Sequence, residues 1–186
     1  VNYTLHQNPT DTTTLKGHLA SHLELYGAYP ETLTADAGYG SEENYELLEA
    51  SSINAYVKYN TFNQEQRGKI KPLSTDSLYY NIEQDCYYCP MGQQMKRTGT
   101  GKRTTANGFE QEVTFYQAVR CEGCPLRGAC HKAKGNRVIE INHNLKKHKA
   151  KARENLLSEE GIAHRKKRCA DVEPVFGNIK SNHNFK

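Results

Sequence analysis

Apolar positions along the first 59 residues change repeatedly between the spacing of a strand and the spacing of a helix. Leu15, Leu19 and Leu23 recur at every fourth residue, as on one face of a helix. The predicted elements are a strand at 1–7, a helix at 12–26, a strand at 32–35, a helix at 42–50 and a strand at 53–57. Strands and helices in this order predict an α/β sheet with helices on its faces.

This alternation then stops. Residues 60–141 are polar, with short β-like pieces around their cysteines, and the Gly/Thr-rich stretch at 98–108 is a hairpin or a loop. Residues 142–186 are basic and have helical spacing, with an interruption near 158–161 that predicts two helices. The predicted segments are an α/β part at 1–59, a small cysteine-rich β insertion at 60–141 and a basic helical segment at 142–186 that completes the core.

Composition and charge add two constraints. Only 36% of the 186 residues are hydrophobic and the mean hydropathy is −0.85, which is low for a chain that builds a complete core alone. We therefore expect part of the core to be missing. Residues 1–130 carry 11 Lys and Arg against 15 Asp and Glu, whereas residues 131–186 carry 14 against 6. The C-terminal third is the predicted contact surface for a polyanion.

The ends of the chain carry no targeting signal in the sequence. No apolar run approaches the length of a membrane span, and no basic, apolar leader opens the chain. These features predict a cytoplasmic protein. Because the first residue is Val1 rather than Met, we also expect that the natural start lies upstream.

Five of the six cysteines fall into two groups, and Cys169 stands apart in the basic segment. In a chain without a secretion signal, this grouping favours a metal site over disulfides. Two Cys-x2-Cys pairs fit a four-thiolate zinc ribbon, in which Cys130 or His131 could replace one ligand. The alternative is a metal-free β insertion whose reduced thiols pack together. The predicted Zn²⁺ ligands are Cys86, Cys89, Cys121 and Cys124.

Two acidic residues are candidates for hard-metal chemistry. Asp36 follows the predicted strand at 32–35 and precedes a glycine turn, so its carboxylate is expected at the carboxyl end of that strand. Glu173 lies in the predicted last helix, and Lys180, seven residues later, shares its face. Taken alone, Asp36 reads as a turn or cap residue and Glu173 as an exposed helix acid. Together they suggest a metal-dependent nuclease-like core.

Four longer strings carry a resemblance to a known family. They are QNPTDT at 7–12, ADAGYGSEENY at 35–45, CEGCPLRGAC at 121–130 and VEPVFGNIK at 172–180. With them, nearly the whole chain resembles bacterial insertion-sequence transposases of the DDE class. That resemblance implies an RNase H-like fold with three acids that bind Mg²⁺, of which Asp36 is the second and Glu173 the third. Lys180 matches the lysine that the family places seven residues after the Glu to contact transposon-end DNA.

The sequence departs from the family pattern in two places. The family's arginine, four residues before the Glu, is replaced by Cys169, with Arg168 one position earlier. The first acid and the first strands of the core would precede Val1, so we expect this chain alone to be inactive and its RNase H-like core to be incomplete. Arg168 and Lys180 are the predicted DNA phosphate contacts.

The resemblance implies a functional prediction with one rival. The complete protein would cleave transposon ends and join them to target DNA, self-associating on the DNA in the bacterial nucleoid. The rival is a non-catalytic nucleic-acid-binding remnant built on a zinc ribbon and a basic helix.

Overall fold

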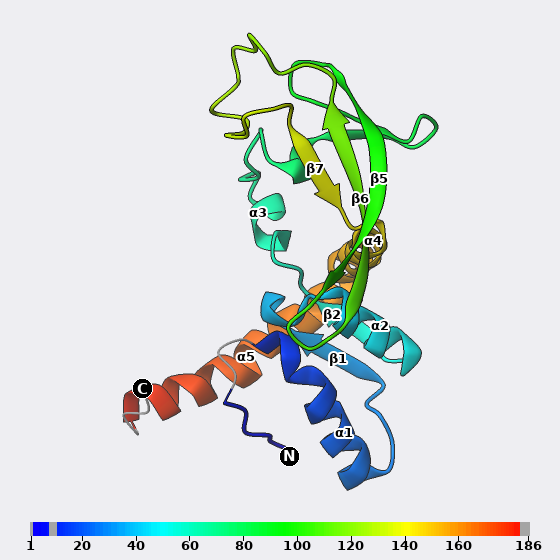
Figure 1. The fold of residues 1–186 in the computed structure, drawn as a ribbon. Helices are drawn as coiled ribbons and strands as arrows, with labels where there is room; N and C mark the ends of the chain where they lie inside the picture. The colour runs from blue at the N-terminus through cyan, green and yellow to red at the C-terminus, as the bar shows by residue number, and fades with distance from the viewer. Residues whose placement is uncertain (1, 8–10, 183–186) are drawn as a thin grey trace. The chain divides into compact units, whose positions relative to one another are not determined.

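The computed structural model describes residues 2–7 and 11–182, which form two compact units in a mixed α/β structure. Unit 1 comprises Val1–Phe62 and Lys147–Lys186, and unit 2 comprises Asn63–Lys146. Figure 1 shows the course of the chain through both units. In the part of the chain that is described, no helix has the length and apolar character needed to cross a membrane.

Unit 1 follows the predicted order of elements closely. The chain runs through η1 (Asp11–Thr13), α1 (Leu15–Tyr26), β1 (Thr32–Ala35), η2 (Ala37–Tyr39), α2 (Glu42–Ala50) and β2 (Asn54–Val57), and returns through most of α4 (His143–Leu157) and all the described residues of α5 (Glu159–Asn182). Gly27 ends α1 in the left-handed conformation, with φ of 73°, and Ser41 caps α2 by accepting from the Asn44 backbone N–H. The helices and strands predicted between residues 12 and 57 are confirmed.

The β1–β2 pair is parallel and is the sheet of unit 1. Thr32 pairs with Asn54 and Ala35 pairs with Val57, and α2 makes the connection between the two strands. The buried residues of this unit include Leu15, Leu19, Leu48, Val57 and Leu156. The core of unit 1 therefore joins the early helices to α4, which lies about a hundred residues later in the sequence.

The predicted strand at 1–7 is not a strand over its described residues, 2–7. Thr4 Oγ1 lies 3.0 Å from His18 Nδ1, and Asn2 Nδ2 donates to Ser21 Oγ at 3.3 Å. This segment therefore bonds to α1 through its side chains. Its alternating pattern is strand-like, but a strand also needs a ladder partner for its backbone groups, and residues 2–7 pair with neither β1 nor β2.

Unit 2 is built on a five-stranded antiparallel sheet with the order β3-β4-β5-β6-β7. Its elements are the rest of α3 (Phe62–Gln66), η3 (Thr75–Ser77), β3 (Tyr79–Asn81), β4 (Cys86–Tyr88), β5 (Gln94–Thr104), β6 (Glu110–Ala118) and β7 (Val138–Ile141). Residues 98–108 belong to a β5–β6 hairpin, which decides between the two predicted alternatives. Figure 1 shows β5 and β6 as the longest strands of this unit.

One face of this sheet packs a buried cluster that includes Tyr87, Met95, Tyr116 and Ile139. The Tyr116 hydroxyl donates to Asp85 Oδ1 at 2.5 Å, and this hydrogen bond lowers the pKa of the Asp85 carboxyl. Burial, and then the hydrogen bond to Asp85, raise the pKa of Tyr116. A partly buried hydrogen bond thus joins β6 to the turn before β4, in addition to the apolar packing.

The predicted break between the two late helices is confirmed at Ser158, between α4 and α5. Ser158 Oγ accepts from the Gly161 backbone N–H at 3.0 Å, so the serine caps α5. The two helices approach closely here, because a Cβ atom on Gly161 would lie within 2.0 Å of the Asn155 carbonyl oxygen. This corner directs α5 back toward the β1–β2 pair.

Candidate active site

Asp36 lies at the carboxyl end of β1, where sequence analysis predicted it. Because β1 and β2 are parallel, the residue after β2, Lys58, lies at the same edge of the sheet. Lys58 Nζ is 4.0 Å from Asp36 Oδ1, and the Asp36 side chain is 49% exposed. The sheet therefore presents a half-exposed carboxylate at the edge where open α/β sheets bind ligands.

A second cation reaches Asp36 from α5. Arg168 Nη2 donates to Asp36 Oδ2 at 2.5 Å, and the Arg168 side chain is 17% exposed. The preceding turn of α5 contacts the same part of unit 1: the His164 ring stacks on Tyr56 with centroids 4.6 Å apart, and the Arg165 guanidinium lies 5.4 Å from the centroid of Phe62. Arg168, predicted as a phosphate contact, thus bonds to the predicted metal ligand.

The loop after Asp36 is held by Asn44, a buried residue of α2. Its amide nitrogen donates to the carbonyl oxygens of Tyr39 and Thr12, both at 2.9 Å. Thr12 Oγ1 in turn donates to the carbonyl of Gly38 at 2.8 Å. Asn44 therefore joins the loop to the segment that begins α1. Its role could not be predicted from the sequence, because its partners are carbonyls that only the folded chain brings near.

Replacing Asn44 with Asp should destabilise unit 1 by about 2 kcal/mol, because a carboxylate cannot donate to the two carbonyls and leaves buried acceptors unpaired. The change conserves the size of the side chain, so lost packing contributes little. The free energy of unfolding in urea, followed by circular dichroism, measures the effect. The exposed Asn63, changed to Asp, is the control, and an equal loss there would show that added charge alone is the cause.

Glu173 and Lys180 both belong to α5, and their side chains lie outside the part of the structure that is described. The helix continues from Arg168 through Glu173 and past Pro174 without a break. Five residues along an α-helix correspond to a rise of about 7.5 Å. The backbone that carries Glu173 is therefore a little over one turn from the residue that contacts Asp36.

Asp36 has the donor chemistry that Mg²⁺ prefers, a solvent-accessible carboxylate. Among the side chains described within residues 2–7 and 11–182, no three His, Cys, Asp or Glu residues are grouped closely enough to hold a metal ion. The Asp36 carboxylate is in contact with two cations, Lys58 and Arg168. The donor type of Asp36 thus fits a hard cation.

The predicted zinc ligands divide between two places. Three of them, Cys89, Cys121 and Cys124, line one cavity of about 20 Å³ in unit 2, together with Cys130 and His131. Cys86 does not line this cavity, and its thiol donates to Gln84 Oε1 at 3.7 Å. Tyr87, next to Cys86 on β4, belongs to the buried cluster that also contains Cys121. Because successive side chains of a strand point to opposite faces, Cys86 faces away from that cluster.

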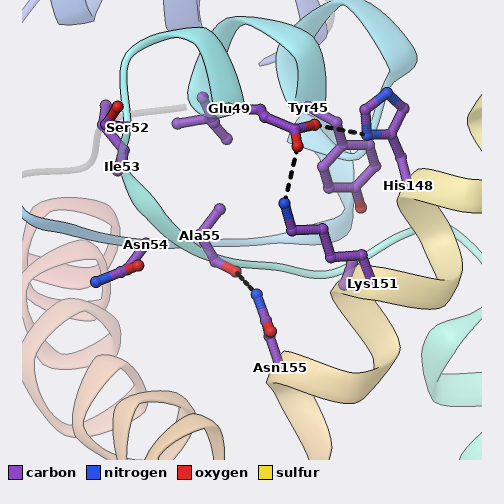
Figure 2. A pocket seen from close by; sticks show the side chains of 11 residues that line it. Tyr45, Glu49, Ser52, Ile53, Asn54, Ala55, His148, Lys151 and Asn155 are labelled. Carbon is purple, nitrogen blue, oxygen red and sulfur yellow. Dashed lines mark hydrogen bonds and ion pairs between the residues drawn. The ribbon is translucent and has the colours of Figure 1, made fainter.

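A larger cavity of about 330 Å³ in unit 1 lies at the other end of the β1–β2 pair, where β2 begins (Figure 2). Glu49 lines it and accepts from Lys151 Nζ at 2.9 Å, with His148 Nδ1 3.7 Å away. The hydrogen bond from Lys151 lowers the pKa of Glu49. Asn155 donates to the carbonyl of Ala55 across the same cavity. This cavity is separate from Asp36, because parallel strands begin and end at opposite edges.

Comparison with known families identifies the chain. No curated protein and no solved structure matches it. A family model described as a transposase DDE domain matches residues 88–186. The matched segment contains α4 and α5, with Arg168, Glu173 and Lys180, whereas Asp36 lies before it. Because the match covers more than half of its residues, the chain belongs to the family of transposase DDE domains.

Proposed function

We propose that Asp36 and Glu173 are metal-binding acids of a DDE transposase. The complete protein would cleave transposon ends and join them to target DNA by metal-dependent phosphoryl transfer. The observation that carries the proposal is the contact between Arg168 and Asp36, because α5, the helix that bears Glu173, thereby reaches the edge of the sheet where Asp36 lies. The test is Mg²⁺-dependent cleavage of transposon-end DNA by the complete protein, which we expect to require both acids.

The fold we propose for the core is RNase H-like, with unit 2 inserted into it. Unit 1 is assembled from residues on both sides of unit 2, as expected for a core interrupted by an insertion. Its parallel β1–β2 pair, connected through α2, is compatible with such a core. The family match extends through α4 and α5, the helices with which the chain returns to unit 1.

In the proposed site, Asp36 and Glu173 would hold Mg²⁺. The bound ion would supply Lewis-acid stabilisation of a scissile phosphate and activation of the attacking group. Arg168 and Lys58 neutralise and orient the Asp36 carboxylate in the chain as it stands. Because both side chains are cations at the same edge, they are also suited to hold phosphate oxygens of the DNA.

We propose that the 186-residue chain by itself does not cleave DNA. The support is that the proposed site has two candidate acids in this sequence, Asp36 and Glu173. A two-metal phosphoryl transfer needs several oxygen ligands around the ions. Mg²⁺-dependent cleavage by the purified chain alone would contradict this proposal.

DNA binding is proposed to involve the exposed basic face of α5. Lys166 and Lys167 are exposed and directly precede Arg168. Replacing both lysines with Ala should weaken binding to a duplex oligonucleotide and reduce the slope of log K against log salt by about 2, because each lysine that contacts a phosphate releases about one counterion. Fluorescence anisotropy over a salt series measures the slope.

The control for this prediction is a double substitution of Lys69 and Lys71 with Ala in unit 2, which removes the same charge from exposed positions. We expect the control to retain the slope of the original chain. If both double variants change the slope equally, the effect is one of net charge and the assignment to α5 is wrong.

A further inference from the structure

Two cations of unit 1 rest on a pair of buried aromatic rings that follows β2. Tyr59 and Phe62 are 2% and 0% exposed, and their rings pack edge to face with centroids 5.5 Å apart. Lys149 Nζ, from α4, lies 5.7 Å from the centroid of Tyr59, and the Arg165 guanidinium, from α5, lies over Phe62. Because the two rings pack against each other, the cations they carry are held in the same part of unit 1.

Neither cation has an acidic partner among the residues that the structure describes. No ion pair there involves Lys149 or Arg165. The Arg165 guanidinium also makes no hydrogen bond with a described residue, and its Nε is buried. An aromatic ring offsets only part of the cost of withdrawing a cation from water, and a buried donor without an acceptor adds to that cost. The cation pair, Lys149 with Arg165, therefore lacks an anion with oxygen acceptors.

The cation pair is a neighbour of the Asp36 carboxylate along two segments of the chain. On α5, Arg165 is three residues before Arg168, which donates to Asp36 Oδ2. Residues three apart share a face of a helix, and the rise between them is about 4.5 Å. After β2, Tyr59 directly follows Lys58, whose Nζ is 4.0 Å from Asp36 Oδ1. An anion bound by the pair would therefore lie about one helical turn from the candidate active site.

We propose that Lys149 and Arg165 hold a backbone phosphate of the DNA strand that reaches Asp36. A phosphodiester supplies one negative charge and oxygen acceptors, which a guanidinium binds through two parallel N–H donors and an ammonium binds as a point charge. The inference rests on the proposed function of Asp36, because it takes DNA as the source of the phosphate. Both side chains act as positioning residues, which place the strand and take no part in the chemical step.

The test is the salt dependence of DNA binding by the whole 186-residue chain, measured by fluorescence anisotropy with a duplex oligonucleotide and EDTA. Lys149→Gln and Arg165→Gln should each reduce the slope of log K against log salt by about 1, because each removes one phosphate contact. The double variant should lose about 2. Lys147→Gln is the matched control, because Lys147 is exposed on α4 two residues before Lys149, and it should retain the original slope.

Arg165→Lys separates a phosphate contact from packing on Phe62. The lysine keeps the positive charge and loses the paired donors, so we expect the original slope with weaker binding. Urea unfolding of the same variants measures any structural role. If Arg165→Gln lowers the free energy of unfolding and keeps the original slope, Arg165 serves the fold alone and the proposal is overturned. An equal loss of slope in Lys147→Gln, or no binding of the duplex by the original chain, would also overturn it.

Because binding is measured in EDTA, its outcome is independent of the metal chemistry proposed for Asp36. If cleavage by the complete protein requires Asp36 and Glu173 while Lys149→Gln and Arg165→Gln bind with the original slope, the phosphate site is wrong and the proposed function stands. If both variants lose slope while cleavage is insensitive to the acids, the proposed function is wrong and the phosphate site stands as a contact with nucleic acid.

Discussion

Replacing Asp36 with Asn is expected to reduce cleavage of transposon-end DNA by the complete protein about 10³-fold or more. An amide keeps the shape of the side chain and removes the negative charge that would hold Mg²⁺. Loss of one carboxylate ligand from a catalytic metal site costs several kcal/mol of transition-state stabilisation, and about 4 kcal/mol corresponds to a factor of about 10³. Cleavage under single-turnover conditions with Mg²⁺ measures the rate.

DNA binding should survive the same change. Asp36 is half exposed and lies against Arg168 and Lys58, so its neutralisation leaves two cations available for phosphates. Binding by Asp36→Asn should therefore be as strong as that of the original protein, or stronger. The loss of stability should be at most about 1 kcal/mol, because ion pairs of partly exposed groups contribute little.

A matched pair of substitutions on α5 tests the partner acid. Glu173→Gln should lose cleavage to the same extent as Asp36→Asn. Asp171→Asn, at an exposed position two residues earlier on the same helix, should retain it. Equal activity of Glu173→Gln and Asp171→Asn would remove Glu173 from the proposed site.

The rival function gives a different set of results. A non-catalytic nucleic-acid-binding remnant predicts no Mg²⁺-dependent cleavage by the complete protein and DNA binding that is insensitive to both acids. The location of Asp36 favours the enzyme, because its side chain makes no cap hydrogen bond to η2 and lies half exposed at the carboxyl edge of a parallel pair. Mg²⁺-dependent cleavage by the complete protein, if it is lost when either Asp36 or Glu173 is replaced, would decide in favour of the enzyme.

Local sequence signals predicted most elements of unit 1. The helix of Leu15 and Leu19 could be predicted because apolar spacing, and a glycine at the C-terminus, act within a few residues. The strand at 1–7 could not be judged in the same way, since its pattern says nothing about whether a neighbouring strand exists.

The candidate site was predictable only in part, for a similar reason. The chain position of Asp36, between a strand and a glycine turn, is a local signal. Its contacts with Lys58 and Arg168 depend on the pairing of β1 with β2 and on the return of α5, which no local pattern reports. The cysteines show the same limit: equal spacing of two Cys-x2-Cys pairs cannot reveal that Cys86 lies outside the cavity that the other three line.

Two glycines in the loop after Asp36 look alike in the sequence and differ in the structure. A Cβ atom on Gly40 would lie 2.4 Å from the carbonyl oxygen of Lys58 and 2.8 Å from Cα of Tyr59, which are both backbone atoms. A Cβ atom on Gly38 would meet only the exposed Asp11 side chain, with Oδ2 at 3.2 Å and Cβ at 3.5 Å. Neither glycine has positive φ, so the difference is one of space.

Gly40→Ala is therefore expected to lower the free energy of unfolding by about 3 kcal/mol, because backbone on both sides must move apart to admit the methyl group. The movement would also separate the loop after Asp36 from the segment after β2, which starts at Lys58. Cleavage by the complete protein should therefore decrease together with the free energy of unfolding. Gly38→Ala should change the unfolding free energy by less than about 1 kcal/mol, since Asp11 can turn away and the unfolded chain loses entropy. Urea unfolding of the two variants measures the contrast, and equal losses would show that the close approach at Gly40 does not control the position of this loop.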